Sequence, residues 1–394
     1  MKKTYISFIF LFFSTFCYAH KIDTTTAKQV ALSYMQAKTN LFYQKSKTDI
    51  HLVYQAYSSS NTMENFPLFY VFNMDNSGFI IVSADERSRP VLAYSTESTF
   101  DINHISPATR SWIESYQNEI THIIEQNLDT PPSFSEEWQI LSNPHIVRQE
   151  NTENTESSQT PLISSKWGQG TRYNTQCPYD TAIGSYCVTG CVVVAMTQVM
   201  NYWKHPVRGM GSHSYTYPPY GVLSANFENT TYLYDSMPDA LYSSTSANQI
   251  YAVANFMYHC GVAIEVQYGV YGSDATLAEY TAGSTSGELA LKTYFGYPDV
   301  IGLHRSSYND AQWVNILKNE IDSGRPVIYR GSGDVGGHAF IFDAYNDSDY
   351  FHVNWGWNGI ADGYFLVSAL NPMSYSFPNG HYCLVNIKPT TSLI

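Results

Sequence analysis

Two residues of this sequence have the chemical types and the settings of a nucleophile and its base. Cys191 stands directly after Gly190, at the head of the almost wholly apolar run CVVVAM. We predict a helix from Cys191 with Thr189 as its N-cap, which places the thiol among the unpaired N–H groups of the first turn. Those groups and the helix dipole stabilise a thiolate and so lower the pKa of the thiol. The alternative is a buried, inert cysteine.

A thiolate nucleophile needs a base, and His338 has the most suitable setting of the 12 histidines. A glycine-rich loop over 331–337 ends at His338, where an alternating strand is predicted to begin. A turn at 346–349 leads into a second predicted strand, 350–357. The alternative is a histidine that only ends a strand.

The register of this hairpin decides which side chains lie beside His338. A four-residue turn brings Trp355 and Trp357 to the face of His338 and turns Asn354 to the other side, and a turn one residue shorter or longer reverses this. The imidazole then lies beside an aromatic wall, a carboxamide, or both. With the thiol, this makes a Cys–His arrangement in which the base takes the thiol proton and a third group orients the imidazole.

Composition narrows the class of protein. The chain has 394 residues, enough for two or three domains, and 14% of them are charged. A formal net charge of −13 disfavours a nucleic-acid partner, because phosphate binding needs a basic face. No cluster has the spacing of zinc ligands, and no later segment is apolar enough to cross a bilayer. We expect no metal and no other cofactor.

Residues 1–19 are typical of a secretory signal peptide, with two lysines, an apolar stretch and predicted cleavage after Ala19. The protein is therefore expected outside the cell or in a periplasm. A lipoprotein signal through Cys17 is the alternative, but the residues before it fit that pattern poorly. Five cysteines remain, so at least one thiol is unpaired or pairs between chains, and Cys177 and Cys187 could bridge each other.

The elements that position these residues fall into two units separated by a polar segment. Residues 20–135 read as a small unit with helices over 25–40 and 106–126 and a hairpin over 67–86. Residues 136–160 are predicted as a linker, whose part 148–160 has no apolar residue. This linker is either a spacer or, as we predict, a site where the chain is cut during maturation.

Residues 161–394 read as a larger domain. Helices are predicted from Cys191 and over 247–259, 287–295 and 310–324, and strands over 326–331, 338–345, 350–357 and 363–370. Helices first and antiparallel strands last indicate an α+β fold.

Three ordered motifs, TGCVVVAMTQVMNYW, VGGHAFIFDAY and FHVNWGWNG, resemble those of the streptopain family of papain-like cysteine peptidases. The stretch SGFIIVSADERSRPVLAYSTESTFD resembles that family's inhibitory propeptide, and ISSKWGQGTRYN resembles the start of its mature domain. The resemblance covers nearly the whole chain. It implies a papain-like peptidase domain, a helical part plus an antiparallel sheet, preceded by a small α+β inhibitory prodomain.

The resemblance also implies roles for single residues. Cys191 matches the nucleophile and His338 the general base and later acid. Trp355 and Trp357 match the aromatic pair that packs on the histidine, and Asn354 matches the orienting asparagine.

Two further matches concern the substrate. Gly337 matches a contact to the substrate main chain. Gln169 matches the oxyanion-hole glutamine, acting with the Cys191 N–H, although it could be a plain loop residue.

Two places depart from the family pattern. Asn358 stands where we expect a glycine, and the substrate loop at 267–287 is longer than usual. The propeptide residue that disturbs the catalytic histidine is expected within 103–108.

We therefore expect a secreted cysteine endopeptidase made as a self-processing zymogen, with protein or peptide substrates and its own prodomain as an intramolecular inhibitor. The resemblance implies an apolar residue two positions before the cut, and the loop at 331–337 could move to admit substrate. Two alternatives are a peptidoglycan stem-peptide amidase or endopeptidase, marked by muropeptide release, and an inactive peptidase-like binding protein, marked by a thiol that takes no label.

Overall fold

The computed structural model describes residues 20–38, 50–58, 66–74, 78–143, 159–278, 283–333, 336–367 and 381–390. The predicted signal peptide and residues 144–158 of the predicted linker lie outside these ranges. Within them, no helix has the length and apolarity that a membrane span requires.

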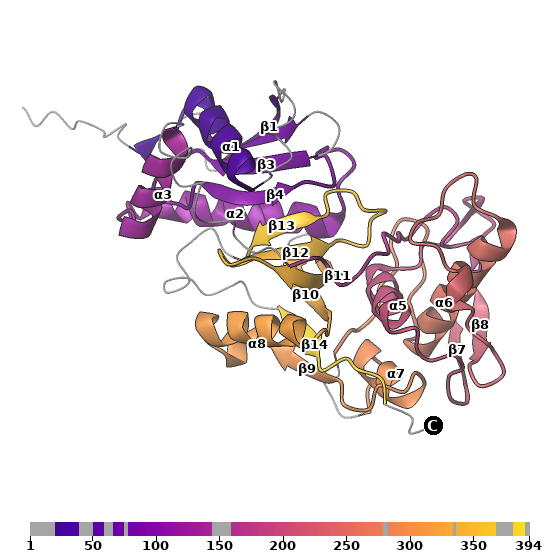
Figure 1. Ribbon diagram of the computed structural model, residues 1–394. Coiled ribbons are helices and arrows are strands. Elements are labelled where there is room, and N and C mark those ends of the chain that lie inside the picture. Colours follow the sequence, from indigo (N-terminus) through magenta and orange to yellow (C-terminus); the bar gives the residue numbers. More distant parts are fainter. Residues whose placement is uncertain are drawn as a thin grey trace, which may run out of the picture.

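The N-terminal unit is an antiparallel meander with helices against it (Figure 1). Helix α2 begins with Ser106 as its N-cap and has Pro107 in its first turn, within the helical range 106–126 that the sequence predicts. Helix α3 crosses the predicted boundary at residue 135 and keeps Trp138 and Leu141 buried, so the ordered part of the unit continues to Ser142. The elements are α1 (Thr24–Lys38), β1 (Ile50–Tyr57), β2 (Pro67–Met74), β3 (Gly78–Ser83), β4 (Val91–Ser95), α2 (Pro107–Glu125) and α3 (Pro132–Ser142).

The second unit places its helices before most of its strands, and the predicted α+β class is confirmed. Its first part holds β5 (Tyr179–Asp180), β6 (Ser185–Tyr186), α5 (Cys191–Trp203), β7 (Ser212–Tyr217), β8 (Gly221–Asn226), α6 (Ala247–Ala263) and α7 (Gly287–Thr293). Its second part holds β9 (Ile301–His304), α8 (Asp310–Asp322), β10 (Val327–Gly333), β11 (Gly336–Tyr345), β12 (Tyr350–Asn354), β13 (Gly363–Leu366) and β14 (Tyr382–Val385).

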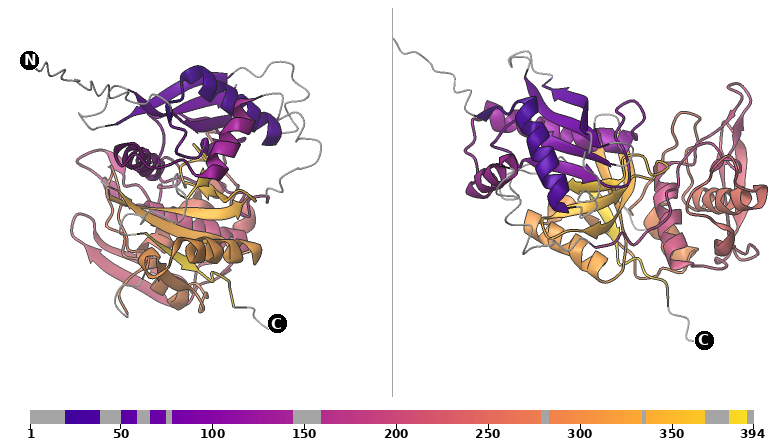
Figure 2. Two further views of the ribbon diagram at one scale, coloured as in Figure 1. Left: turned by 90° about the vertical axis from the view of Figure 1, so that its left-hand side faces the viewer. Right: turned by 45° about the horizontal axis from the view of Figure 1, so that its top comes forward.

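One ten-stranded sheet runs through both units, in the order β1-β2-β3-β4-β13-β12-β11-β10-β14-β9. The junction is the antiparallel pair β4–β13, in which Tyr94 lies opposite Tyr364 and Ala93 opposite Phe365. Figure 2 shows the N-terminal unit stacked directly on the strands of the second unit. The sequence predicted two separate units and gave no sign of this shared sheet.

The strands β10 and β11 separate two cores, because alternate side chains point to opposite faces. On one face, Tyr329 and Phe340 belong to a core that also contains Trp112 of α2. On the other face, Ile328 and Ile341 join the core around α5. The strands that carry the candidate base therefore touch the N-terminal unit on one side and the cysteine helix on the other.

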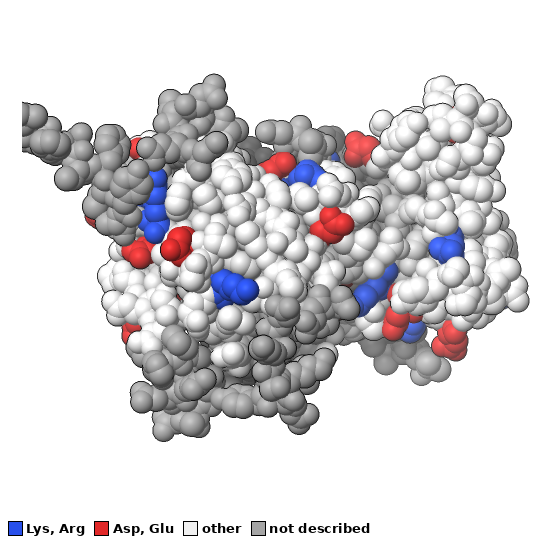
Figure 3. Space-filling view, turned by 90° about the horizontal axis from the view of Figure 1, so that it is seen from above, with Lys and Arg blue, Asp and Glu red and all other residues white. Residues whose placement is uncertain are grey.

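Charged side chains are scattered singly over the face of the molecule seen in Figure 3, with lysine and arginine interspersed among aspartate and glutamate. That face presents no broad basic surface of the kind that binds nucleic acid.

Candidate active site

Cys191 is the first residue of α5, as predicted, but the N-cap is Gly190 and not Thr189. Gly190 has a φ of +92°, which favours glycine, and an added Cβ would lie 3.2 Å from the carbonyl oxygen of Ser273. Thr189 instead donates its N–H to the carbonyl oxygen of Gln169 at 3.0 Å. The predicted N-cap is therefore wrong by one residue, because the backbone of Thr189 bonds to the neighbouring loop at Gln169.

The cysteine helix is buried over most of its length, and the segment before it is fixed by a hydrogen bond. Every residue of α5 from Val192 to Asn201 is buried. Before the helix, the Ser273 hydroxyl donates to the carbonyl oxygen of Val188 at 2.6 Å. Ser273 belongs to the predicted substrate loop, so this loop packs beside the approach to the thiol.

His338 lies on β11, opposite Gly331 of β10. The amide of the next residue, Ala339, donates to the Cys191 sulfur at 3.3 Å, so the two chain segments meet at the thiol. The buried Nε2 atom of His338 has no hydrogen-bond partner among the described residues. The structure thus places the thiol beside the residue that follows His338, and the Nε2 atom of His338 makes no hydrogen bond to the sulfur.

Burial raises the pKa of the Cys191 thiol, although hydrogen bonds from the backbone of Ala339 and Val192 and the charge of Arg330 act in the opposite direction. The sequence predicted a lowered pKa, and this prediction is wrong. The loss of water around the sulfur outweighs the helix terminus. Burial also lowers the pKa of His338, and the charge of Arg330 adds to this effect. Both shifts favour the uncharged forms of the pair.

Arg330 is a neighbour of the site that sequence reasoning missed. Its guanidinium donates to the Tyr382 hydroxyl at 2.6 Å and lies against Gly337, where any added Cβ would clash with it. The predicted substrate contact at Gly337 is therefore covered by a cation in this form. A single arginine on a predicted strand carries no signal that distinguishes it from a surface residue.

The hairpin reaches the predicted register by an unexpected route. A β-bulge at Asp343 absorbs a one-residue shift at the turn, so that Ile341 pairs with Asn354. Phe340 then lies beside Trp355, with ring centroids 4.8 Å apart. The aromatic wall is therefore present on the face predicted for it, and the partly buried Trp357 packs against the same core.

Asn354 points away from the face of His338, as the four-residue turn predicted. Its Nδ2 donates to the Ser165 carbonyl oxygen at 2.8 Å, and its Oδ1 accepts from Gln198 Nε2 at 3.0 Å and from the Gly356 amide at 3.0 Å. These bonds join β12 to helix α5. In this form Asn354 ties two elements together and is not brought to His338.

Gln169 lies near the thiol through its backbone, which pairs with Thr189 two residues before Cys191. Next to it, Asn358 adopts a left-handed φ of +56°, and its amide covers Gly168 so closely that an added Cβ would clash. The asparagine found in place of the expected glycine is thus accommodated by a glycine across from it.

The remaining predictions about ligands and thiols concern residues away from the pair. Cys177 and Cys187 are buried and free, as are Cys260 and Cys383. Within the described ranges, no three histidine, cysteine or acidic side chains are placed to hold a metal ion.

Comparison with known proteins matches both units to families. Residues 167–365 match the model of the peptidase C10 family, and residues 19–120 match a model described as Spi protease inhibitor. Streptopain of Streptococcus pyogenes is 31% identical over 346 residues, which cover 81% of this chain and 80% of that protein. The thiol protease/hemagglutinin PrtT of Porphyromonas gingivalis is 29% identical over 312 residues, covering 78% of this chain and 34% of that protein.

Two solved structures from Prevotella intermedia share the fold. A cysteine-to-alanine variant of prointerpain A has a TM-score of 0.68 and 31% identity, and the match covers 87% of this chain and 100% of that one. Active interpain A has a TM-score of 0.52 and 39% identity, and the match covers 58% of this chain and 95% of that one.

Proposed function

Because the chain belongs to the peptidase C10 family and carries an inhibitory propeptide, we propose that it is a secreted cysteine endopeptidase made as a self-processing zymogen. The observation that supports this most is the contact between the Cys191 sulfur and the Ala339 amide, which sets the thiol beside the residue that follows His338. Helix α5 carries the Cys191 thiol, and strand β11 carries His338.

In the proposed reaction, His338 takes the proton of the Cys191 thiol, and the thiolate attacks a peptide carbonyl carbon. The resulting oxyanion would accept hydrogen bonds from the Gln169 amide and the Cys191 N–H. His338 then gives its proton to the leaving amine, and a thioester acyl-enzyme remains. Water, deprotonated by the same histidine, hydrolyses the thioester and regenerates the thiol.

The other predicted site residues serve this reaction after the prodomain has left. Trp355 and Trp357 form the aromatic surroundings of His338, and Gly337 contacts the substrate main chain once Arg330 has moved aside. Asn354 can orient His338 only if the hairpin rearranges, because its amide is engaged with Ser165 and Gln198 in this form.

The proposed maturation of the chain follows the order of its segments. Residues 1–19 are removed at export, residues 20–135 with helix α3 hold the peptidase inactive, and a cut within 144–160 frees residues 161–394. The substrates are proteins or peptides, and the prodomain is the internal inhibitor.

The test compares residues 20–394 with the Cys191→Ala variant by intact mass over several hours under mild reducing conditions. We expect only the parent chain to lose a fragment that ends within 144–160 and then to digest casein. Iodoacetamide should modify Cys191 in the matured parent. If both chains stay whole and Cys191 takes no label, the proposed function is wrong, and cleavage of both chains would place the activity in a contaminating protease.

A further inference from the structure

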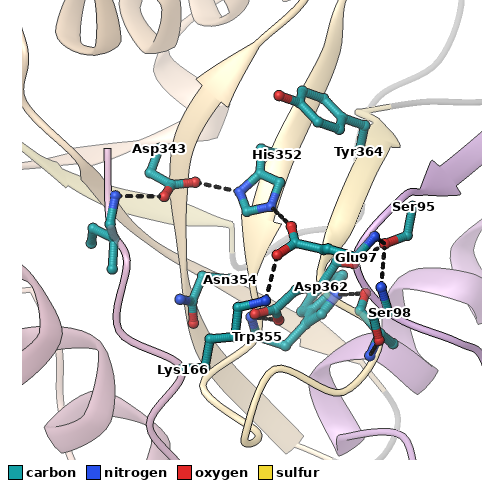
Figure 4. A network of polar contacts seen from close by, with 12 residues as sticks. Ser95, Glu97, Ser98, Lys166, Asp343, His352, Asn354, Trp355, Asp362 and Tyr364 are labelled. Atoms are coloured by element: carbon teal, nitrogen blue, oxygen red, sulfur yellow. Dashed lines mark hydrogen bonds and ion pairs between the residues drawn. The ribbon is translucent and has the colours of Figure 1, made fainter. Parts of the chain in front are cut away.

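One short turn of the N-terminal unit touches the peptidase unit with three side chains. Ser95 is the last residue of β4, Glu97 and Ser98 follow it, and all three bond to residues of the second unit (Figure 4). Ser95 also shapes the turn, because its hydroxyl accepts from the amides of Glu97 and Ser98 at 3.2 and 3.1 Å. The three groups therefore form one preorganised unit.

Glu97 is held by two cations at once. Its Oε1 accepts from His352 Nε2 at 2.6 Å, and its Oε2 accepts from Lys166 Nζ at 2.6 Å. The side chain of His352 is only 4% exposed, whereas those of Glu97 and Lys166 are 32% and 39% exposed. The carboxylate thus closes a buried histidine from the solvent side, and its pairing with His352 is the stronger of the two because it is the better shielded from water.

The positive charge of His352 is built into the peptidase unit. Its Nδ1 contacts Asp343 Oδ1 at 2.6 Å, and the Asp343 side chain is fully buried. Although burial alone would lower it, the Asp343 and Glu97 carboxylates raise the pKa of His352 to about 10. Asp343 is further fixed by the Ile163 amide at 3.0 Å, so this half of the pairing stays when Glu97 leaves.

Ser95 and Ser98 bond to the backbone just before β13. The Ser95 hydroxyl donates to the Asp362 carbonyl oxygen at 2.6 Å, and the Ala361 amide donates to the Ser98 hydroxyl at 2.7 Å. A carbonyl, an amide and two cations of the peptidase thus face three side chains spaced as Ser-x-Glu-Ser. Each donor on one unit therefore faces an acceptor on the other.

We propose that the peptidase unit carries a binding site for an acidic Ser-x-Glu-Ser turn, formed by His352, Lys166 and the backbone of Ala361 and Asp362. In the zymogen its occupant is the turn of the N-terminal unit, and Glu97 is the group that secures it. The site is separate from the thiol and the imidazole, and it makes a local attachment point in an interface that also contains the strand pair β4–β13 and aromatic contacts.

The experiment measures attachment without any catalysis. A recognition sequence for a specific protease is inserted between residues 150 and 151 of the Cys191→Ala chain, and the cut chain is diluted and followed by native mass spectrometry. Glu97→Gln, which keeps the shape and removes the charge, should raise the dissociation constant of the two fragments about tenfold or more. The matched control is Glu125→Gln, an exposed glutamate at the end of α2, which should leave the dissociation constant unchanged.

A change for Glu97→Gln no larger than that for Glu125→Gln would overturn the proposal. Lys166→Met tests the same pairing from the peptidase side, so the result does not depend on one variant folding. If Glu97 and Lys166 act in one site, the rise in the dissociation constant for the double variant should be smaller than the product of the two single rises. Strict independence of Glu97 and Lys166 would also overturn it. Since Cys191 is absent, failure here leaves the proposed peptidase activity untouched.

Discussion

The Cys191 sulfur accepts its hydrogen bond from the Ala339 amide, so the thiol is held by the residue next to His338. Burial raises the pKa of that thiol and lowers the pKa of the imidazole, and both shifts disfavour the thiolate–imidazolium pair. In this form the surroundings of both groups therefore favour the neutral thiol and the neutral imidazole.

The first prediction concerns thiol reactivity. Cys191 in the uncut chain should react slowly with iodoacetamide at pH 7 and faster as the pH rises, because the thiolate is the reacting species. Removal of the prodomain should increase the rate at pH 7. Peptide mass spectrometry gives the rate, with the buried Cys260 as an internal reference. Fast labelling of the uncut chain that does not change with pH would contradict the raised pKa.

The second prediction concerns Trp112 of α2, which crosses into the peptidase core. Its ring centroid lies 5.6 Å from that of Phe340 and 6.1 Å from that of Trp355, and its Nε1 donates to the Leu366 carbonyl oxygen at 3.2 Å. Trp112→Ala in the Cys191→Ala chain should lower the free energy of unfolding by about 3–5 kcal/mol, measured in urea. Trp112→Phe, which keeps a ring, should lose clearly less, and equal losses would argue against the packing role.

The third prediction is a pH dependence of stability that arises from Asp362. Burial raises the pKa of its carboxyl to about 7, against an ordinary value of 3.8, although a hydrogen bond from the Trp355 amide lowers it. Between these values the folded chain holds a proton that the unfolded chain has lost, so stability should fall as the pH rises from about 4 to about 7.

Two neighbours of Asp362 leave a clear window for this measurement. The pKa of Glu97 is lowered to about 2, chiefly by its bond to His352, so its contribution is complete above its ordinary value of 4.5. The raised pKa of His352 keeps its contribution complete below 6.5. Urea unfolding at pH 4.5 and 6.5 should therefore show a slope of at most about 1.4 kcal/mol per pH unit. Asp362→Asn should remove it, and an unchanged slope would assign it elsewhere.

The fourth prediction separates two roles of Asn354. Asn354→Ala should lower the free energy of unfolding of the Cys191→Ala chain by about 1–3 kcal/mol, because it leaves buried partners on Ser165 and Gln198 unpaired. In the matured enzyme, the pH profile of kcat/KM tests the orienting role. A shifted profile is expected if the asparagine reaches His338 after activation, and an unshifted one would leave it purely structural.

Patterns of apolar residues predicted much of the framework. The helices at Cys191 and Pro107 and the hairpin that carries His338 all form where their periodicity and turn residues indicate. The register also came out as predicted beyond the bulge at Asp343, because the buried face of β11 tolerates only one alternation.

Other features depend on contacts between distant segments and leave no local mark. The pairing of β4 with β13 joins residues far apart in the chain, and the sequence pattern of neither strand indicates which strand it pairs with. The pKa of Cys191 was predicted from its helix alone, whereas burial by other elements decides its direction. In the sequence, Glu97 is one polar residue of a loop, and its role becomes visible only when the fold brings His352 and Lys166 to it.

The shared sheet has a consequence for what happens when the two units part. Separation opens two strand edges at the same moment, β4 on one fragment and β13 on the other, and each exposes unpaired backbone donors and acceptors. Such edges invite pairing with any available strand. The proposed maturation would therefore leave each product with one exposed strand edge that favours association.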